Sequence, residues 1–245
     1  MTINYKIIIH FDGTDYCGWQ YQKPEYKTIQ AELFRVLKII GKNRIIVTGS
    51  SRTDAGVHAK GLVANFHLSV SIEPGSLKKA LNALLPKDIR VVDCLIVEKS
   101  FNARFGAKSK TYQYRIFTGQ VQSPFDQRYA WHFPFPLDVK AMRRALIHFK
   151  GEKDFTSFTS GETERKKIRE INEIKIRVKN EEITFTVQGR SFLRYMVRNI
   201  VGTIVDVGRK KIAPADIPAI FTAKNRQKAG QTAPAKGLTL IKVDY

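Results

Sequence analysis

Two similar α+β units, each with the element order β-α-β-β-α-β, are the fold that this sequence predicts. Stretches of strand length with alternating or continuous apolar residues recur along the 245 residues, separated by segments with apolar residues at helical spacing. The order of these segments in the first half returns in the second, without a repeat in the sequence itself. This order is typical of ferredoxin-like folds. We expect mainly antiparallel sheets that join, flanked by helices, with a basic cleft.

The first predicted unit covers residues 1–105. Its expected strands span residues 5–11, 44–50, 57–68 and 89–97. A helix is predicted over residues 28–40, because five apolar residues recur there on one face. A second helix is predicted over residues 76–85, with Ser76 as its N-cap and Pro86 as its stop.

The second predicted unit covers residues 106–245. Its expected strands span residues 111–117, 168–178, 182–188 and 238–243. Helices are predicted over residues 138–149, 192–207 and 217–223, the first with Asp138 as its N-cap. The turn Lys179-Asn180-Glu181 predicts a hairpin between the second and third of these strands.

The charge balance favours a polyanionic partner. The chain holds 42 basic and 22 acidic residues, a formal charge of +20 at pH 7. Each phosphate that a cation neutralises releases counterions, so we expect nucleic acid. An anionic membrane or a merely solubilising charge are the alternatives, and a membrane is disfavoured because the basic residues are spread along the chain.

The sequence also indicates a cytoplasmic protein. No apolar stretch approaches the ~20 residues that cross a bilayer, and the first ten residues lack a signal-peptide layout. Cys17 and Cys94 are too few for a disulfide framework, so we expect reduced thiols.

Motifs for several common chemistries are missing. The sequence has no dinucleotide-binding or P-loop glycine motif, no nucleophile elbow and no H-E-x-x-H. Its five histidines are scattered, and no Cys/His cluster has the spacing of zinc ligands. We therefore expect neither a metal nor a small-molecule cofactor.

One acidic residue stands out in this basic chain. Asp54 follows Arg52 and precedes Gly56, between an apolar run at residues 45–47 and an alternating run at residues 62–66. The pattern predicts strand, tight loop and strand, with Asp54 at the loop tip. Asp54 could be an ordinary turn residue, or a nucleophile or base that Arg52 keeps ionised. Arg52 could equally contact a phosphate.

Two further segments are candidates for the site. Residues 101–115 interleave basic and aromatic side chains, which could stack a base and hold phosphates, or form a basic edge strand with Tyr112 and Tyr114 in the core. Within residues 190–202, one apolar helix face is predicted that burial alone explains, formed by Leu193, Met196, Val197, Ile200 and Val201. Arg198 lies beside that face, where a partly buried guanidinium would need an anionic partner.

Several motifs occur together in one order. The specific ones are Arg52-Thr53-Asp54-Ala55-Gly56-Val57-His58-Ala59, Phe101-x-Ala103-Arg104 leading to Lys110-x-Tyr112-x-Tyr114, and Met196-Val197-Arg198-Asn199-Ile200-Val201-Gly202. Weaker ones are Asp12-Gly13 with Gly18-Trp19-Gln20, Asp154-Phe155-Thr156-Ser157-Phe158, and Ala235-x-Gly237-Leu238. On these motifs the chain resembles the tRNA pseudouridine synthase A family over nearly its whole length.

The resemblance implies an isomerase that converts uridine to pseudouridine at positions 38, 39 and 40 of the tRNA anticodon arm. It implies that Asp54 is the essential carboxylate, that Arg198 pairs with it, and that Tyr112 stacks on the base and takes the C5 proton. Arg52 would displace the target base, and the remaining predicted RNA contacts are His58, Arg104 and Lys110. The resemblance also implies a homodimer that holds tRNA across both subunits, without a cofactor.

Some questions stay open at this level. Asp54 could attack C1′, add to C6 or remove the C2′ proton. Ser51 stands where the family most often has glycine, and Glu164-Arg165-Lys166-Lys167 replaces an Arg-Thr element. The rival hypothesis is an RNA-binding module without chemistry. A DNA-binding protein ranks behind both, because no helix-turn-helix or zinc-finger signature is present.

Overall fold

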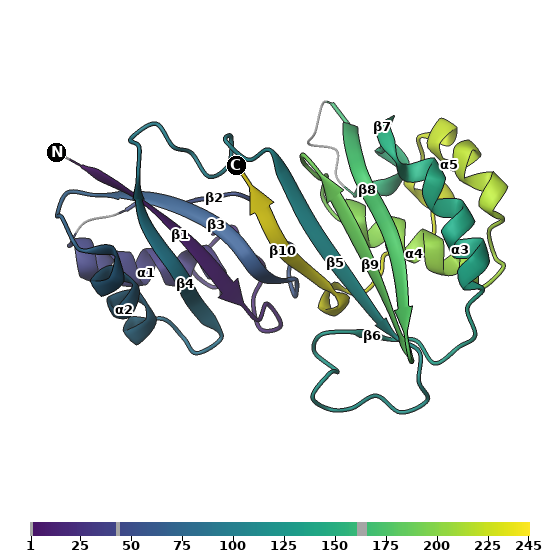
Figure 1. Cartoon of the computed structure of the whole chain (residues 1–245), viewed down its shortest axis with the longest axis horizontal. Coiled ribbons are helices and arrows are strands. Elements are labelled where there is room, and N and C mark those ends of the chain that lie inside the picture. Colours follow the sequence, from purple (N-terminus) through teal and green to yellow (C-terminus); the bar gives the residue numbers. More distant parts are fainter. Residues whose placement is uncertain (1, 43–44, 161–165) are drawn as a thin grey trace. The chain divides into compact units, whose positions relative to one another are not determined.

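A computed structural model describes residues 2–42, 45–160 and 166–245 of the chain. The described chain forms two compact units. The first comprises residues 1–108 and 239–245, and the second comprises residues 109–238. Figure 1 shows the elements of both.

The first unit is a mainly antiparallel sheet with two helices. Its elements are β1 (Ile3–Phe11), α1 (Ile29–Gly41), β2 (Thr48–Gly49), β3 (His58–Leu68), α2 (Pro74–Leu84), β4 (Ile89–Val97) and β10 (Leu238–Asp244). β1 lies between β4 and β3 and is antiparallel to both. β2 is antiparallel to β3, whereas β10 runs parallel to β3 through Thr239 and Leu240. The start of β3, which follows the Asp54 loop, is therefore held inside a sheet.

The core of the first unit follows the strand and helix periods. Tyr5, Ile7, Ile9 and Phe11 alternate along β1 and are all buried. Helices α1 and α2 lie together on one face of this sheet (Figure 1). Thr28 caps α1, because its side chain accepts a hydrogen bond from the backbone N–H of Ala31 at 3.2 Å.

The second unit is also a mainly antiparallel sheet with helices. Its strands and α-helices are β5 (Ser109–Phe117), β6 (Trp131–His132), α3 (Val139–Leu146), β7 (Gly151–Asp154), β8 (Ile168–Lys179), β9 (Glu182–Gly189), α4 (Met196–Gly208) and α5 (Ile217–Ala223). Single 3-10 turns span Ile147–Phe149, Thr156–Phe158, Pro214–Asp216, Arg226–Lys228 and Ala235–Gly237. The strand order is β5-β9-β8-β7, and β6 pairs with β5 in parallel.

The predicted class is confirmed at this level: the described chain is α+β, with mainly antiparallel strands and five α-helices. The predicted hairpin is confirmed as well, since β8 and β9 pair and Asn180 takes the left-handed conformation in their turn (φ +53°).

Four details differ from the predictions. The strand expected over residues 44–50 is only β2, and Arg44 lies outside the described residues. The helix expected from residue 192 begins at Met196, because Tyr195 has a φ of +59° that a helix cannot contain. β6 and β7 were not predicted, and at two and four residues they are too short for a periodic signal. Residues 239–245, which hold most of the last strand, group with the first unit rather than with residues 109–238.

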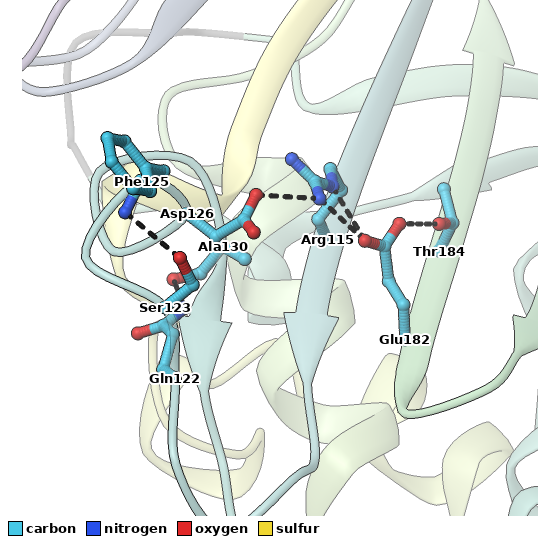
Figure 2. A network of polar contacts seen from close by, with 8 residues as sticks. All are labelled: Arg115, Gln122, Ser123, Phe125, Asp126, Ala130, Glu182 and Thr184. Atoms are coloured by element: carbon cyan, nitrogen blue, oxygen red, sulfur yellow. Dashed lines mark hydrogen bonds and ion pairs between the residues drawn. The ribbon is translucent and has the colours of Figure 1, made fainter.

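A 13-residue connection, residues 118–130, links β5 to β6. Figure 2 shows how it is held: Arg115 of β5 bonds Glu182 at 2.6 Å and Asp126 of the connection at 3.3 Å. Within the connection, the backbone N–H of Phe125 donates to the Ser123 hydroxyl at 3.2 Å. The backbone is thus ordered by polar contacts.

Both cysteines are free thiols. Cys17 is exposed, and burial raises the pKa of Cys94 to about 11. Within the described residues, no helix has the length and apolar character needed to cross a membrane.

Candidate active site

Asp54 opens a four-residue turn between β2 and β3. The backbone N–H of Val57 donates to the Asp54 carbonyl at 3.2 Å, which closes the turn. Gly56 has a φ of +75°, a conformation that glycine adopts without strain and other residues rarely do. The Asp54 side chain is partly exposed, whereas Thr53 before it and Val57 after it are buried. Asp54 is thus a half-exposed carboxylate between two buried residues.

A second segment, residues 16–19, fixes the backbone of this turn. The N–H of Trp19 donates to the Thr53 carbonyl at 3.1 Å, and the N–H of Gly56 donates to the Tyr16 carbonyl at 3.2 Å. These bonds clamp the turn on both sides of Asp54.

Gly18 allows residues 16–19 to approach the turn closely enough for these bonds. Its φ is +90°, and a Cβ there would lie 2.5 Å from the Thr53 carbonyl oxygen and 3.0 Å from the Asp54 carbonyl carbon. Any larger residue would therefore push the Asp54 backbone away. Gly49, in β2 before the loop, allows the Trp19 ring to pack closely against the backbone, because a Cβ there would lie 2.4 Å from that ring.

His58 ends the loop, and it is buried. Its Nδ1 lies 3.1 Å from the backbone N of Gly13 and 3.1 Å from a carboxylate oxygen of Asp12. One nitrogen cannot accept from Gly13 and donate to Asp12 at once, so whether Nδ1 carries a hydrogen decides between these partners. In both states His58 ties the loop to residues 12–13.

Ser51 fits its position. Its φ is not positive, so serine in place of the family's usual glycine introduces no backbone strain there. The preceding Ser50 is buried; its hydroxyl accepts from the N–H of Val63 at 3.2 Å.

Tyr112 lies on β5 in the second unit. It is 6% exposed and meets the ring of Phe192 edge-on, with the ring centroids 5.2 Å apart. Tyr114, two residues on, is fully buried, and its phenol donates to the Pro234 carbonyl at 2.7 Å. Burial raises the pKa of Tyr114, which stays a neutral core residue. The core alternative raised for both tyrosines therefore agrees with the burial of both, and most fully with that of Tyr114.

Arg198 lies in the first turn of α4, also in the second unit. Its Nε donates to the Ala233 carbonyl at 2.8 Å, and the Ala233 N–H donates back to the Arg198 carbonyl at 3.2 Å. Its guanidinium carbon lies 4.9 Å from the centre of the Tyr195 ring. The guanidinium is thus oriented by a backbone carbonyl and an aromatic ring.

The other predicted RNA contacts differ in exposure. Arg52 and Arg104 are exposed, but His58 and Lys110 are only 3% and 9% exposed. Of the predicted residues, Arg52, Asp54 and His58 share one loop of the first unit, and Tyr112 and Arg198 belong to the second. The pairing of Asp54 with Arg198 stays a prediction. Of the altered element before β8, Glu164 and Arg165 lie outside the described residues, and Lys166 and Lys167 are described.

Sequence reasoning assigned no role to residues 12–19. Their motifs, Asp12-Gly13 and Gly18-Trp19-Gln20, appeared only as marks of the family. The available signal was a pair of glycines in the connection between a strand and a helix, a place where glycine permits close backbone approach.

Comparison with known proteins agrees with these motifs. The family model described as "tRNA pseudouridine synthase" matches residues 7–106 and 145–245. A tRNA pseudouridine synthase A from Geobacillus sp. (strain WCH70) is 44% identical, over 100% of this chain and 99% of its own length. The enzyme of the same name from Thermosipho melanesiensis is 45% identical, over 98% of each chain. The chain therefore belongs to the tRNA pseudouridine synthase family.

Proposed function

We propose that this chain isomerises uridine to pseudouridine in the anticodon stem-loop of tRNA, at positions 38, 39 and 40, with Asp54 as the essential carboxylate. The observation that carries the proposal is the Asp54 turn. Its backbone bonds to Tyr16 and Trp19 fix the main chain on both sides of a half-exposed carboxylate. A preorganised carboxylate is what nucleophilic or general-base chemistry requires.

The reaction is balanced without another reactant. The N1–C1′ bond breaks, the uracil turns, and C5 bonds to C1′; the proton lost from C5 is matched by one gained at N1. Asp54 could attack C1′, add to C6, or remove the C2′ proton. Each needs an ionised carboxylate, which the predicted pairing with Arg198 would favour.

The second unit would supply the other groups. Tyr112 would stack on the base and accept the C5 proton, and Arg198 would pair with Asp54. The Nε bond of Arg198 to Ala233 supports a fixed orientation for that guanidinium. Arg52 is exposed on the Asp54 loop and could take the place of the target base once it leaves the stack.

We infer a ferredoxin-like arrangement in both units, with joined sheets and a basic cleft that receives the tRNA. The sheet order β4-β1-β3, with β2 on β3, supports this in the first unit. We also infer a cytoplasmic homodimer. The charge of +20 supports a polyanionic substrate.

The test is direct. Purified chain is incubated with unmodified tRNA transcripts, and pseudouridine is mapped by mass spectrometry. We expect pseudouridine at positions 38–40 and at no other uridine. A chain that binds these transcripts but forms no pseudouridine in any of them would be an RNA-binding module, and the proposed isomerase activity would be wrong.

A further inference from the structure

The turn at residues 101–108 of the first unit is ordered but presents an aromatic side chain to solvent. The carboxamide oxygen of Asn102 accepts from the backbone N–H groups of Arg104 at 2.9 Å and Phe105 at 3.0 Å. The N–H of Gly106 then donates to the Asn102 carbonyl at 2.9 Å. These bonds fix the backbone on either side of Phe105.

The turn is also tied to the sheet beneath it. The Ala103 N–H donates to the side chain of Asn65 on β3 at 2.9 Å, and the Ala103 carbonyl accepts from the phenol of Tyr245 at 2.7 Å. The Phe101 carbonyl accepts from Asn4 on β1 at 3.0 Å. Three separate parts of the unit hold this one turn, so its tip has a defined position.

Phe105 is the side chain at the tip. It is 77% exposed, although burying a phenylalanine typically stabilises a protein by about 1.5–3 kcal/mol. The guanidinium carbon of Arg104 lies 5.5 Å from the centre of its ring. Exposed apolar residues are common, but Phe105 combines exposure with an ordered backbone and a cation against the ring.

The segment that carries Phe105 is basic. Residues 99–108 include Lys99, Arg104 and Lys108, all exposed, and no acidic residue. Lys6 lies 5.8 Å from the centre of the Phe101 ring in the same turn. An aromatic ring among cations suits a single-stranded nucleic acid, whose base stacks on the ring while its phosphates meet the charges.

We propose that Phe105 is a stacking platform for an unpaired base of the RNA, with Arg104 and Lys108 contacting the adjoining phosphates. This rests on the proposed function only in taking tRNA as the ligand. The site is distinct from the predicted reaction groups Asp54, Tyr112 and Arg198, and gives an exposed aromatic residue a role in recognition.

The chain contains a matched control. Phe125 is 88% exposed on the connection shown in Figure 2, where its backbone is ordered by Ser123. That connection, residues 118–130, carries only Asp126 and Arg128 as charged residues, so its net charge is zero. Phe125→Ala therefore removes a similarly exposed aromatic ring from a segment that has no net charge.

The experiment measures the dissociation constant of tRNA for full-length variants over a range of salt concentrations. Phe105→Ala is expected to weaken binding by about 5- to 150-fold, the range found for loss of base stacking, without changing the salt dependence. Phe105→Trp should bind like the wild type. Arg104→Ala should make the logarithm of the affinity fall less steeply with the logarithm of the salt concentration, by the amount that about one phosphate contact contributes. Phe125→Ala should leave both quantities unchanged.

Several outcomes would overturn the platform. The first is that Phe105→Ala binds tRNA as tightly as the wild type. The second is that Phe105→Leu keeps the full wild-type affinity, because leucine is apolar but cannot stack on a base. A change of oligomeric state in Phe105→Ala, measured by light scattering, would assign this face to a protein contact instead. Pseudouridine formation by the wild type is measured in parallel. Its absence would contradict the proposed function while leaving the stacking result valid.

Discussion

At the scale of single residues, the candidate site depends on glycines as much as on Asp54. Gly18 approaches the Asp54 turn so closely that a Cβ would lie 2.5 Å from the Thr53 carbonyl oxygen. Because backbone atoms cannot move aside as a flexible side chain can, this contact constrains the position of the carboxylate. The proposed catalytic carboxylate and the glycine that constrains its turn are far apart in sequence.

Gly18→Ala is expected to cost activity beyond its cost in stability. The strained φ destabilises the protein by about 1–3 kcal/mol, and displacement of the turn should lower kcat by about 100-fold. The measurement is kcat and KM at a temperature where the variant is folded, with the free energy of unfolding measured alongside.

Gly151→Ala is the control, because Gly151 has a similar φ of +87° with no atom within 4 Å of the added Cβ. It should lose stability but keep its kcat. Equal losses of kcat in both variants would mean that strain alone, rather than contact with the Asp54 turn, explains the effect.

Asp54 could be predicted as a candidate because its neighbours are local: a turn glycine, a nearby arginine and two flanking apolar runs. Gly18, Trp19 and the Asp12–His58 contact could not be assigned roles, because their effect arises from the folding of residues 12–19 against residues 53–58. Spacing within one segment carries no information about which distant segment packs on it.

At the scale of elements, the ion pairs around Arg115 join β5 to β9 and to the connection at residues 118–130. Arg115 bonds Glu182 at 2.6 Å and Asp126 at 3.3 Å (Figure 2). The hydrogen bond from Arg115 is the largest influence on Glu182, and it lowers the pKa of that carboxyl below its ordinary value of 4.5.

This gives a pH dependence with a defined sign. A lowered pKa in the folded state adds stability above the unfolded-state pKa, and this stability is lost as the pH falls through the folded-state value. The pair is partly exposed, so we expect Glu182→Gln to cost only about 0.5–1 kcal/mol at pH 7 and to cost less at pH 3.

Chemical denaturation at both pH values measures this, with Glu181→Gln, the neighbouring carboxylate, as the control. A cost for Glu182→Gln that is the same at pH 3 and pH 7 would show that the charge of Glu182 is not its source.

The long elements could be predicted and the short ones could not. β1, β8 and β9 carry enough alternating positions to define a strand, whereas β6 and β7 are fixed by pairing with β5 and β8 rather than by their own sequences. The start of α4 was placed four residues early because the apolar spacing continues through Leu193, and only the left-handed Tyr195 interrupts the helix.

At the scale of the whole molecule, charge is the property most visible in the sequence. A formal charge of +20 predicts that tRNA affinity falls steeply as the salt concentration rises. In a plot of the logarithm of the affinity against the logarithm of the salt concentration, each phosphate contact contributes about 0.9 to the slope. β10 is the final element in sequence, and it pairs in parallel with β3 of the first unit. Order along the chain alone does not determine which strand a terminal strand pairs with.

Arg52→Ala should reduce that salt slope by about one, because an exposed arginine on the Asp54 loop would meet a phosphate or the backbone of the displaced nucleotide. Arg35→Ala is the control, since Arg35 already bonds Glu32 at 3.0 Å and should leave the slope unchanged. The slopes come from tRNA dissociation constants at several salt concentrations. An unchanged slope for Arg52→Ala would remove Arg52 from the RNA contacts.

The measurement that tests the central claim most directly is pseudouridine formation by Asp54→Asn. This substitution keeps the size of the side chain and removes only its charge and basicity. We predict no detectable pseudouridine, with tRNA affinity within about twofold of the wild type and an unchanged melting transition, while Asp15→Asn in the same unit stays active. Pseudouridine formation by Asp54→Asn at an appreciable fraction of the wild-type rate would contradict the assignment of Asp54 as the essential carboxylate.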